Sequence, residues 1–141
     1  MKKSVTDKFT NELETAVNKG RNAEESIILM GKAYISFFSK NPDYYTFLYG
    51  KLNICAHLQM DQEYEEDYPP FLLLKKLYRT YLVENGIEQT EKMQEIEIIK
   101  TWALVHGMAS IACMKGIHSS INWDDPDIRL LIPGTNNANC N

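Results

Sequence analysis

The sequence of 141 residues contains few cysteines and no long apolar run. Its three cysteines, Cys55, Cys113 and Cys140, are odd in number and widely spaced, which excludes a disulfide framework and a paired-cysteine zinc half-site. We therefore expect reduced cysteines, two of them as small core residues. Neither a signal peptide nor a membrane-spanning run of about eighteen apolar residues is visible. The expected location is cytoplasmic, without a membrane partner.

Clustered positive charge is also missing. The formal net charge is −4, and the fifteen Lys and Arg residues are scattered along the chain. A nucleic-acid surface needs clustered cations to neutralise phosphates, so these residues alone are not expected to bind DNA. The densest group, Lys75, Lys76 and Arg79, spans about one helical turn. We interpret this group as a solvated helix face.

Strand-like alternation is absent too, and apolar residues instead recur at spacings of three and four, which is typical of helices. Gly and Pro residues separate the periodic segments. The pattern predicts an all-α fold of five to seven helices. Asn18 or Asn22 is available to cap the second helix, and Thr90 to cap the longest. The expected helices cover residues 5–19, 23–40, 42–52, 69–84 and 90–115, with a short continuation to 60 and a short last helix over 127–132 as further candidates.

The acidic stretch from Asp61 to Asp67 is the main polar segment between these helices. A calcium loop would require the regular Asp-x-Asp-x-Asp-Gly pattern, which this stretch lacks. We interpret it as a solvated loop and predict no metal site. Residues 1–133 are expected to form one domain, because the chain is too short for two ordinary ones. The Asn-rich residues 134–141 are expected to be a disordered tail.

The second half of the longest predicted helix is apolar on all sides from Trp102 to Met114. Such a helix must be covered on every side, and a small domain covers only some sides from within. A second copy of the chain is the expected cover, and small residues permit close approach of two helices. The alternative is a central helix in a monomeric bundle. The predicted dimer interface consists of Ala103, Gly107, Ser110, Ile111 and Met114.

Two segments resemble a known family. The run from Thr101 to Ala109 resembles the Trp-x-x-x-His-Gly signature in the carboxy-terminal domains of tetracycline-repressor-like (TetR) transcriptional regulators. Upstream, residues 31–38 and the following run 41–45 are similar to the helix and helix start that precede the effector pocket in that family. The order and spacing of these motifs extend the resemblance over nearly the whole chain.

The resemblance implies an effector-binding and dimerisation domain of a bacterial repressor. In such homodimers an amino-terminal helix-turn-helix reads an operator, and a small, largely apolar molecule in the carboxy-terminal pocket releases the DNA. The first three helices of the family have no counterpart in this sequence. DNA binding is therefore expected only through a domain absent from this chain, and the four-helix bundle that joins two subunits is expected to form here.

An effector pocket would be lined by aromatic and aliphatic side chains from several helices, with a few polar groups that orient the ligand. A plain core position is the alternative for each candidate. His106 stands in an otherwise apolar turn, where an unpaired imidazole is unfavourable, so we expect it to bond a carbonyl, a tyrosine, a second subunit or a ligand. The candidate ligand-binding residues are Tyr34, Phe37, Tyr45, Leu48, Tyr78, Trp102 and His106.

Catalysis is not expected, and neither is a cofactor. A di-iron bundle needs Glu-x-x-His motifs, and no histidine here follows a glutamate by three residues. Cys113 and His106 lie about two turns apart on one predicted helix, too far for a nucleophile and base pair. A haem site on His106 or His57 would rest on a lone histidine. The remaining alternative is a dimeric helical protein-interaction module without a small-molecule pocket.

Overall fold

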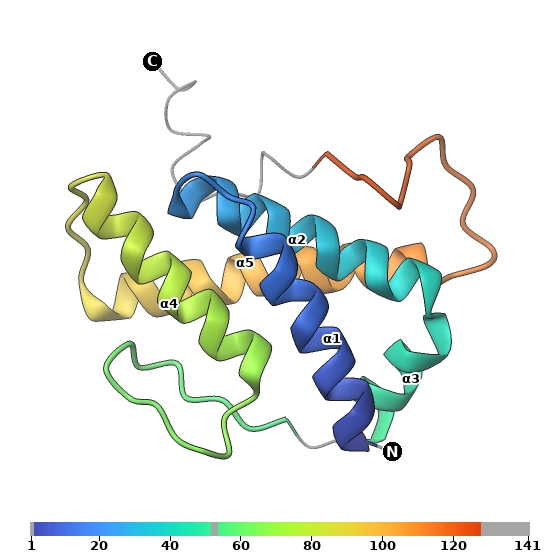
Figure 1. Ribbon diagram of the computed structural model, residues 1–141, viewed down its shortest axis with the longest axis horizontal. Coiled ribbons are helices and arrows are strands. Elements are labelled where there is room, and N and C mark those ends of the chain that lie inside the picture. Colours follow the sequence, from blue (N-terminus) through green and yellow to red (C-terminus); the bar gives the residue numbers. More distant parts are fainter. Residues whose placement is uncertain (1, 52–53, 128–141) are drawn as a thin grey trace.

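The computed structural model describes residues 2–51 and 54–127 (Figure 1). Over these residues the chain forms five helices and no strand, which confirms the predicted all-α fold. No helix in this part is long and apolar enough to cross a lipid bilayer. The helices are α1 (Lys2–Val17), α2 (Ala23–Lys40), α3 (Pro42–Lys51), α4 (Pro69–Glu84) and α5 (Glu91–Ala112).

Helix α2 lies at the centre of the bundle and packs against the four other described helices. It runs beside α5, while α1 crosses on the opposite side (Figure 1). The contact between α1 and α2 is aromatic: the Phe9 ring lies 5.1 Å from Tyr34, 5.0 Å from Phe37 and 4.7 Å from Phe38, measured between ring centroids. Phe9 is fully buried, so α1 belongs to the core although most of its residues are polar.

The predicted capping residues set the starts of two helices. The Asn22 side chain accepts a hydrogen bond of 2.8 Å from the Glu25 amide at the start of α2. Thr90 does the same for Met93 at the start of α5, over 3.2 Å. These contacts satisfy amides that have no partner inside the helix. Gly86 adopts a φ of +60° directly after α4, a backbone conformation that favours glycine.

The predicted bounds of three helical segments were wrong. Helix α1 covers Lys2–Val17 and not residues 5–19. Helix α5 ends at Ala112 and does not reach Lys115, because the amides of Cys113 and Met114 bond to carbonyls three residues back and tighten the last turn. The continuation after α3 is wrong as well, since residues 54–60 form an irregular loop. The last helix expected over 127–132 and the tail over 134–141 lie outside the described residues, apart from Asp127, which is not helical.

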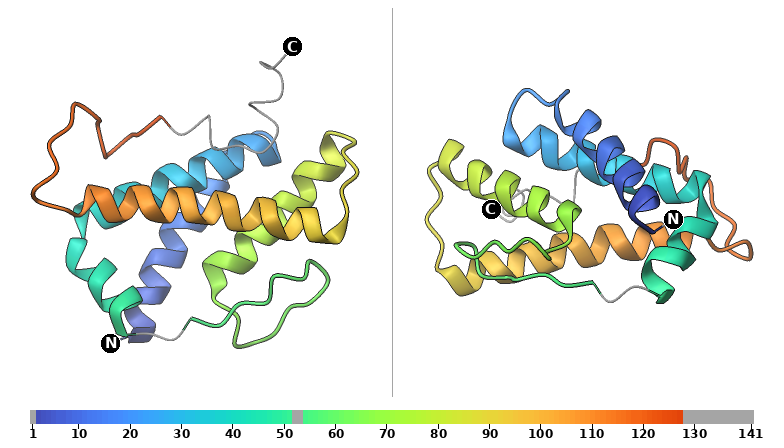
Figure 2. Two further views of the ribbon diagram at one scale, coloured as in Figure 1. Left: turned by 180° about the vertical axis from the view of Figure 1, so that it is seen from behind. Right: turned by 60° about the horizontal axis from the view of Figure 1, so that its bottom comes forward.

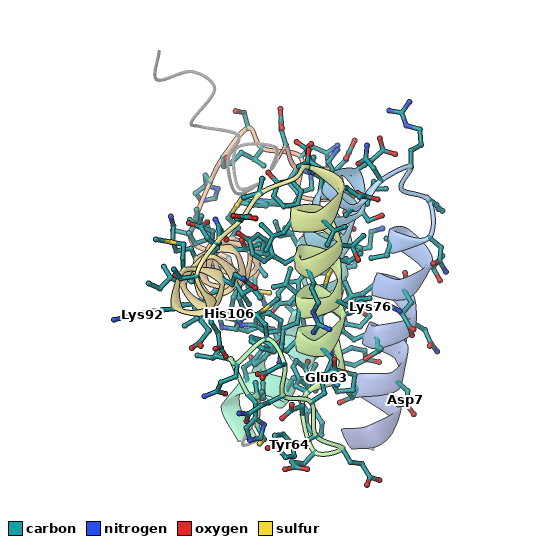
Figure 3. All side chains as sticks on the ribbon, turned by 90° about the vertical axis from the view of Figure 1, so that its left-hand side faces the viewer. Asp7, Glu63, Tyr64, Lys76, Lys92 and His106 are labelled. Carbon is teal, nitrogen blue, oxygen red and sulfur yellow. The ribbon has the colours of Figure 1, made fainter. Side chains whose placement is uncertain are left out.

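The loop of residues 54–68 is folded against α4 by a buried lysine. Lys75, 1% exposed, donates hydrogen bonds of 2.8, 2.7 and 2.7 Å to the carbonyls of His57, Gln59 and Gln62. The interpretation of Lys75 as part of a solvated face was therefore wrong, whereas its neighbour Lys76 does face solvent (Figure 3). The ammonium group thus holds these carbonyls in a non-helical loop, in which the Gln59 carbonyl also accepts the Gln62 amide.

Asp67 also departs from the expected solvated loop. It is 3% exposed, while Asp61 and Glu63 of the same stretch are exposed as expected. Both carboxylate oxygens of Asp67 accept hydrogen bonds within the loop, from the His57 ring and from the Tyr64 amide. A buried carboxylate is stable only with such partners. The Tyr68 amide also donates to the Cys55 carbonyl over 2.9 Å, and this bond joins the two ends of the loop.

Candidate functional site

A cluster of tyrosines surrounds His106 on the inner side of α5. Tyr34 of α2 bonds through its hydroxyl to His106 Nδ1 over 2.9 Å, and Tyr45 of α3 bonds to Nε2 over 3.0 Å. The Tyr34 hydroxyl also lies 2.8 Å from that of Tyr49, which in turn lies 3.3 Å from that of Tyr68. A tyrosine was one of the partners expected for His106, and the structure shows two.

The helix registers explain why these side chains meet. Tyr45 and Tyr49 are four residues apart, so both lie on the face of α3 that is turned to α5. The Tyr45 ring stacks on the His106 ring at 5.2 Å, and the Tyr49 ring stands edge-on to it at 4.6 Å. Figure 3 shows His106 on the side of α5 that faces the bundle, and Lys92 pointing away from it. Four helices or their ends therefore contribute to one cluster.

Burial favours the neutral forms of His106, Tyr34, Tyr49 and Tyr68. Burial lowers the pKa of His106, which favours the neutral imidazole. Burial also raises the pKa of Tyr34 and Tyr49 well above the ordinary value, and it raises the pKa of Tyr68 to about 12. A neutral imidazole carries one N–H and one acceptor nitrogen, so one of the two bonded tyrosines donates to the ring and the other accepts. The hydroxyls form a continuous chain of hydrogen bonds.

A small, partly open space adjoins this cluster between α2, α4 and α5. Its free volume is about 20 Å³, enough for about one water molecule and far below the 300 Å³ or more of an ordinary ligand pocket. The Trp102 ring lies beside this space, 5.6 Å from the rings of both Tyr34 and Phe71. The lining residues are Ile27, Met30, Gly31, Tyr34, Leu74, Thr101, Trp102 and Val105.

The structure brings together four of the seven candidate ligand-binding residues: Tyr34, Tyr45, Trp102 and His106. Phe37 and Leu48 are buried in the core, and Phe37 packs against Phe9 on the side of α1. Tyr78 lies apart from the cluster. Its hydroxyl donates to Gln89 over 2.6 Å, and its ring stacks on Tyr81.

Tyr49 and Tyr68 belong to the cluster but were not among the predicted site residues. The spacing of Tyr45 and Tyr49 is a signal that points to Tyr49. No comparable signal exists for Tyr68, because it follows an irregular loop whose path depends on tertiary contacts. Tyr68 belongs to the cluster because it is buried and its hydroxyl lies 3.3 Å from that of Tyr49.

The outer face of α5 is apolar and exposed. Leu104, Ile111 and Met114 are 48%, 42% and 51% exposed, and the left view of Figure 2 shows α5 in front of the other helices. A methyl group added at Gly107 would meet no atom within 4 Å, so packing within the chain does not require this glycine. The residues predicted for the dimer interface, Ala103, Gly107, Ser110, Ile111 and Met114, are all at least partly exposed, and Met93, Ile96, Ile99 and Leu104 extend this outer face.

The cysteines differ from expectation in one respect. Cys113 is half-buried and its thiol donates to the Phe38 carbonyl over 3.3 Å, as a small core residue can. Cys55 lies at the surface, and Cys140 lies outside the described residues. Both described cysteines are free thiols.

Comparison of the chain with known protein families, with curated proteins and with solved structures finds no match.

Proposed function

We propose that this chain is the ligand-sensing and dimerisation domain of a bacterial, TetR-like repressor, a cytoplasmic homodimer that binds a small, largely apolar effector. The observation that carries the proposal is the division of α5 into two faces. Its outer face is apolar and exposed around Gly107, and its inner face holds His106 among tyrosines of α2 and α3. A helix that contacts a second subunit on one side and a ligand on the other can couple the two events.

The outer face of α5 is too small to form a stable dimer interface by itself. A helix of 22 residues is about 33 Å long and about 10 Å wide, so its exposed side covers on the order of 330 Å². A stable interface buries about 800 Å² on each partner. A second helix of each chain is therefore needed, in agreement with a four-helix bundle between subunits.

Gly107 provides a direct test of the dimer. A Cβ atom at this position meets no atom within 4 Å in the single chain, so the fold should persist in Gly107→Leu while the two copies of α5 are held apart. Sedimentation velocity should show a dimer for the wild type and a monomer, or a dimer weakened at least about tenfold, for Gly107→Leu. Gly116→Leu is the matched control, because Gly116 also faces open space but is not among the predicted interface residues. A monomeric wild type, or an unchanged Gly107→Leu dimer, contradicts the proposal.

The effector would bind by widening the small space beside Trp102. This space has room for about one water molecule, so the effector would select a conformation in which α4 or Trp102 moves outward. The Tyr34 hydroxyl and His106 would then orient a polar group of the ligand, while Ile27, Leu74 and Val105 cover its apolar part. A shift of Trp102 would also reach α2 through Tyr34.

The effector can be sought by thermal unfolding against lipophilic aromatic cations, acids and dyes. A ligand at one hundred times its dissociation constant adds about 2.7 kcal/mol of stability, which raises the Tm by about 8 °C for a domain of this size. Tyr34→Phe should reduce the shift given by the best compound, because it removes the hydroxyl beside the space. Tyr78→Phe is the control and should leave the shift unchanged. Equal effects of the two variants would contradict binding at this cluster.

A second function is a dimeric protein-interaction module with a filled interior. The observation that favours it is the free volume of about 20 Å³. The same experiments separate the two functions. If the chain is a dimer but no compound in a broad panel changes its Tm, the interaction module is the better description.

A further inference from the structure

The loop between α3 and α4 brings together three side chains of a kind that bind metal ions. The Sγ of Cys55, an imidazole nitrogen of His57 and a carboxylate oxygen of Asp67 all lie within 4.8 Å of one another. His57 Nδ1 is 2.6 Å from Asp67 Oδ1, and Cys55 Sγ is 3.9 Å from the same oxygen. The three residues are two and ten positions apart, so the folded loop, and not a local sequence motif, creates this group.

The surrounding structure holds these side chains in place. Asp67 Oδ2 accepts the Tyr64 amide over 3.2 Å, and the Tyr64 ring lies 4.1 Å from the His57 ring. The bond from the Tyr68 amide to the Cys55 carbonyl keeps Cys55 beside Asp67. The Lys75 ammonium group donates a hydrogen bond to the His57 carbonyl. Hydrogen bonds around a metal site orient the side chains that bind the ion.

One side of the group is open to solvent. The Asp67 side chain is fully buried, but the His57 side chain is 32% exposed and Cys55 lies at the surface. An ion could therefore enter from solvent, and a water molecule could take a further coordination position. Figure 3 shows Tyr64 at the outer edge of the molecule, away from His106. The three side chains are thus distinct from those of the tyrosine cluster, and Tyr68 links the two through its amide bond to Cys55 and its hydroxyl contact with Tyr49.

We propose that Cys55, His57 and Asp67 bind one zinc ion, with a water molecule as the fourth ligand. Zinc accepts thiolate, imidazole and carboxylate ligands together, whereas calcium and magnesium prefer several oxygen ligands and avoid sulfur. One thiolate and one carboxylate neutralise the two charges of the ion. On binding, the Cys55 thiol loses its proton to solvent, His57 keeps one proton on Nε2, and the Nδ1 lone pair binds the ion. This proposal does not depend on the proposed sensor function.

The distances require only a small rearrangement. For tetrahedral zinc with Zn–S of about 2.3 Å and Zn–N and Zn–O of about 2.1 Å, the ligand atoms stand about 3.6 Å (S to O) and about 3.4 Å (N to O) apart. The present separations are 3.9 Å from Sγ to Oδ1 and 2.6 Å from Nδ1 to Oδ1. The distance from the Cys55 sulfur to the Asp67 oxygen is therefore already close to the required one. The His57 ring must move by about 1 Å to exchange its hydrogen bond to Asp67 for a bond to zinc.

The test uses the full chain, treated with a chelator and kept reduced. Zinc is titrated in competition with a coloured chelator, and cobalt(II) then replaces zinc as a spectroscopic probe. We expect one zinc ion per chain and an intense near-ultraviolet band from cobalt bound to a thiolate. Cys55→Ser should remove this band and weaken zinc binding at least about tenfold, because it removes a direct ligand. Cys113→Ser, the matched control, should keep both.

His57→Gln and His118→Gln form a second matched pair. His118 is exposed and lies outside the loop, so only His57→Gln should weaken binding. Both His57 and Cys55 lie near the surface, and circular dichroism of the metal-free variants checks that they fold. Zinc should also raise the Tm of the wild type but not that of Cys55→Ser. No zinc uptake by the wild type, or equal uptake by Cys55→Ser and Cys113→Ser, would overturn the proposal.

Discussion

Replacement of Lys75 by methionine should destabilise the protein strongly. The ammonium group is buried and makes three hydrogen bonds to carbonyls, at 2.8, 2.7 and 2.7 Å. Methionine has a similar volume and similar helix propensity, so the substitution removes the charge and its bonds and changes little else in α4. It also removes a cation that stabilises the buried Asp67 carboxylate. The loss should appear as a lower free energy of unfolding.

The magnitude follows from the contacts. Hydrogen bonds to a charged group contribute about 1.5–3 kcal/mol each, so three bonds set an upper range of about 4.5–9 kcal/mol. Gln59 and Gln62 are exposed, so water can replace part of what their carbonyls lose. Removal of one partner from a buried ionic contact costs about 3–5 kcal/mol. We expect about 3 kcal/mol, at the lower end of that range.

Urea unfolding of the metal-free protein measures this loss. With a slope of about 2 kcal/mol per molar, a loss of 3 kcal/mol lowers the midpoint by about 1.5 M. Lys76→Met is the control, because Lys76 is the next residue and faces solvent, and it should change stability by less than about 0.5 kcal/mol. Hydrogen exchange at the Tyr68 amide should accelerate in Lys75→Met, since this amide bonds to Cys55 across the loop. Equal midpoints for the two variants would refute the assigned role of Lys75.

Two further predictions concern a buried histidine and a crowded turn. Burial lowers the pKa of His106 in the folded state, so the unfolded chain takes up more protons and stability should fall as the pH drops below about 6.5. His106→Gln should lessen this loss in urea midpoints, and a wild-type-minus-variant difference that stays constant with pH would count against it. Gly20→Ala should cost about 1–3 kcal/mol in the same assay, because the added carbon would clash with Ser26 and lie 2.8 Å from its backbone nitrogen. Gly116→Ala faces open space and should be neutral or slightly stabilising, so similar midpoints for the two alanine variants would contradict the packing argument.

Local sequence signals were sufficient for the helices. The spacing of apolar residues, the prolines at positions 42 and 69 and the caps at Asn22 and Thr90 predicted five helical segments that the structure contains. Such signals act over one or two turns, so they do not depend on the rest of the fold. The predicted end of α5 failed because the tightened turn after Ala112 has no comparable local signal.

The burial of Asp67 and Lys75 could not be predicted from the local sequence. Asp67 belongs to an acidic stretch and Lys75 to a basic group, and neither differs in type from its exposed neighbours. Their burial depends on partners 3 to 18 residues away, such as the Tyr64 amide and the His57 carbonyl. The group of Cys55, His57 and Asp67 arises from the same folding of the loop and therefore has no signature of its own in the sequence.

Helix α5 separates the two kinds of information most clearly. The sequence alone determined that this helix has almost no polar side after Trp102 and that His106 needs a hydrogen-bonding partner, since both follow from composition and period. Only the tertiary structure decided which side is covered. Packing against the rest of the bundle, mainly α2, buries one side with Ile98, Val105 and Ala109. His106 bonds to Tyr34 and Tyr45, and Gly107 faces open space. The physical reason is that apolar side chains gain the same free energy of burial on any face, so only packing against a particular neighbour selects one.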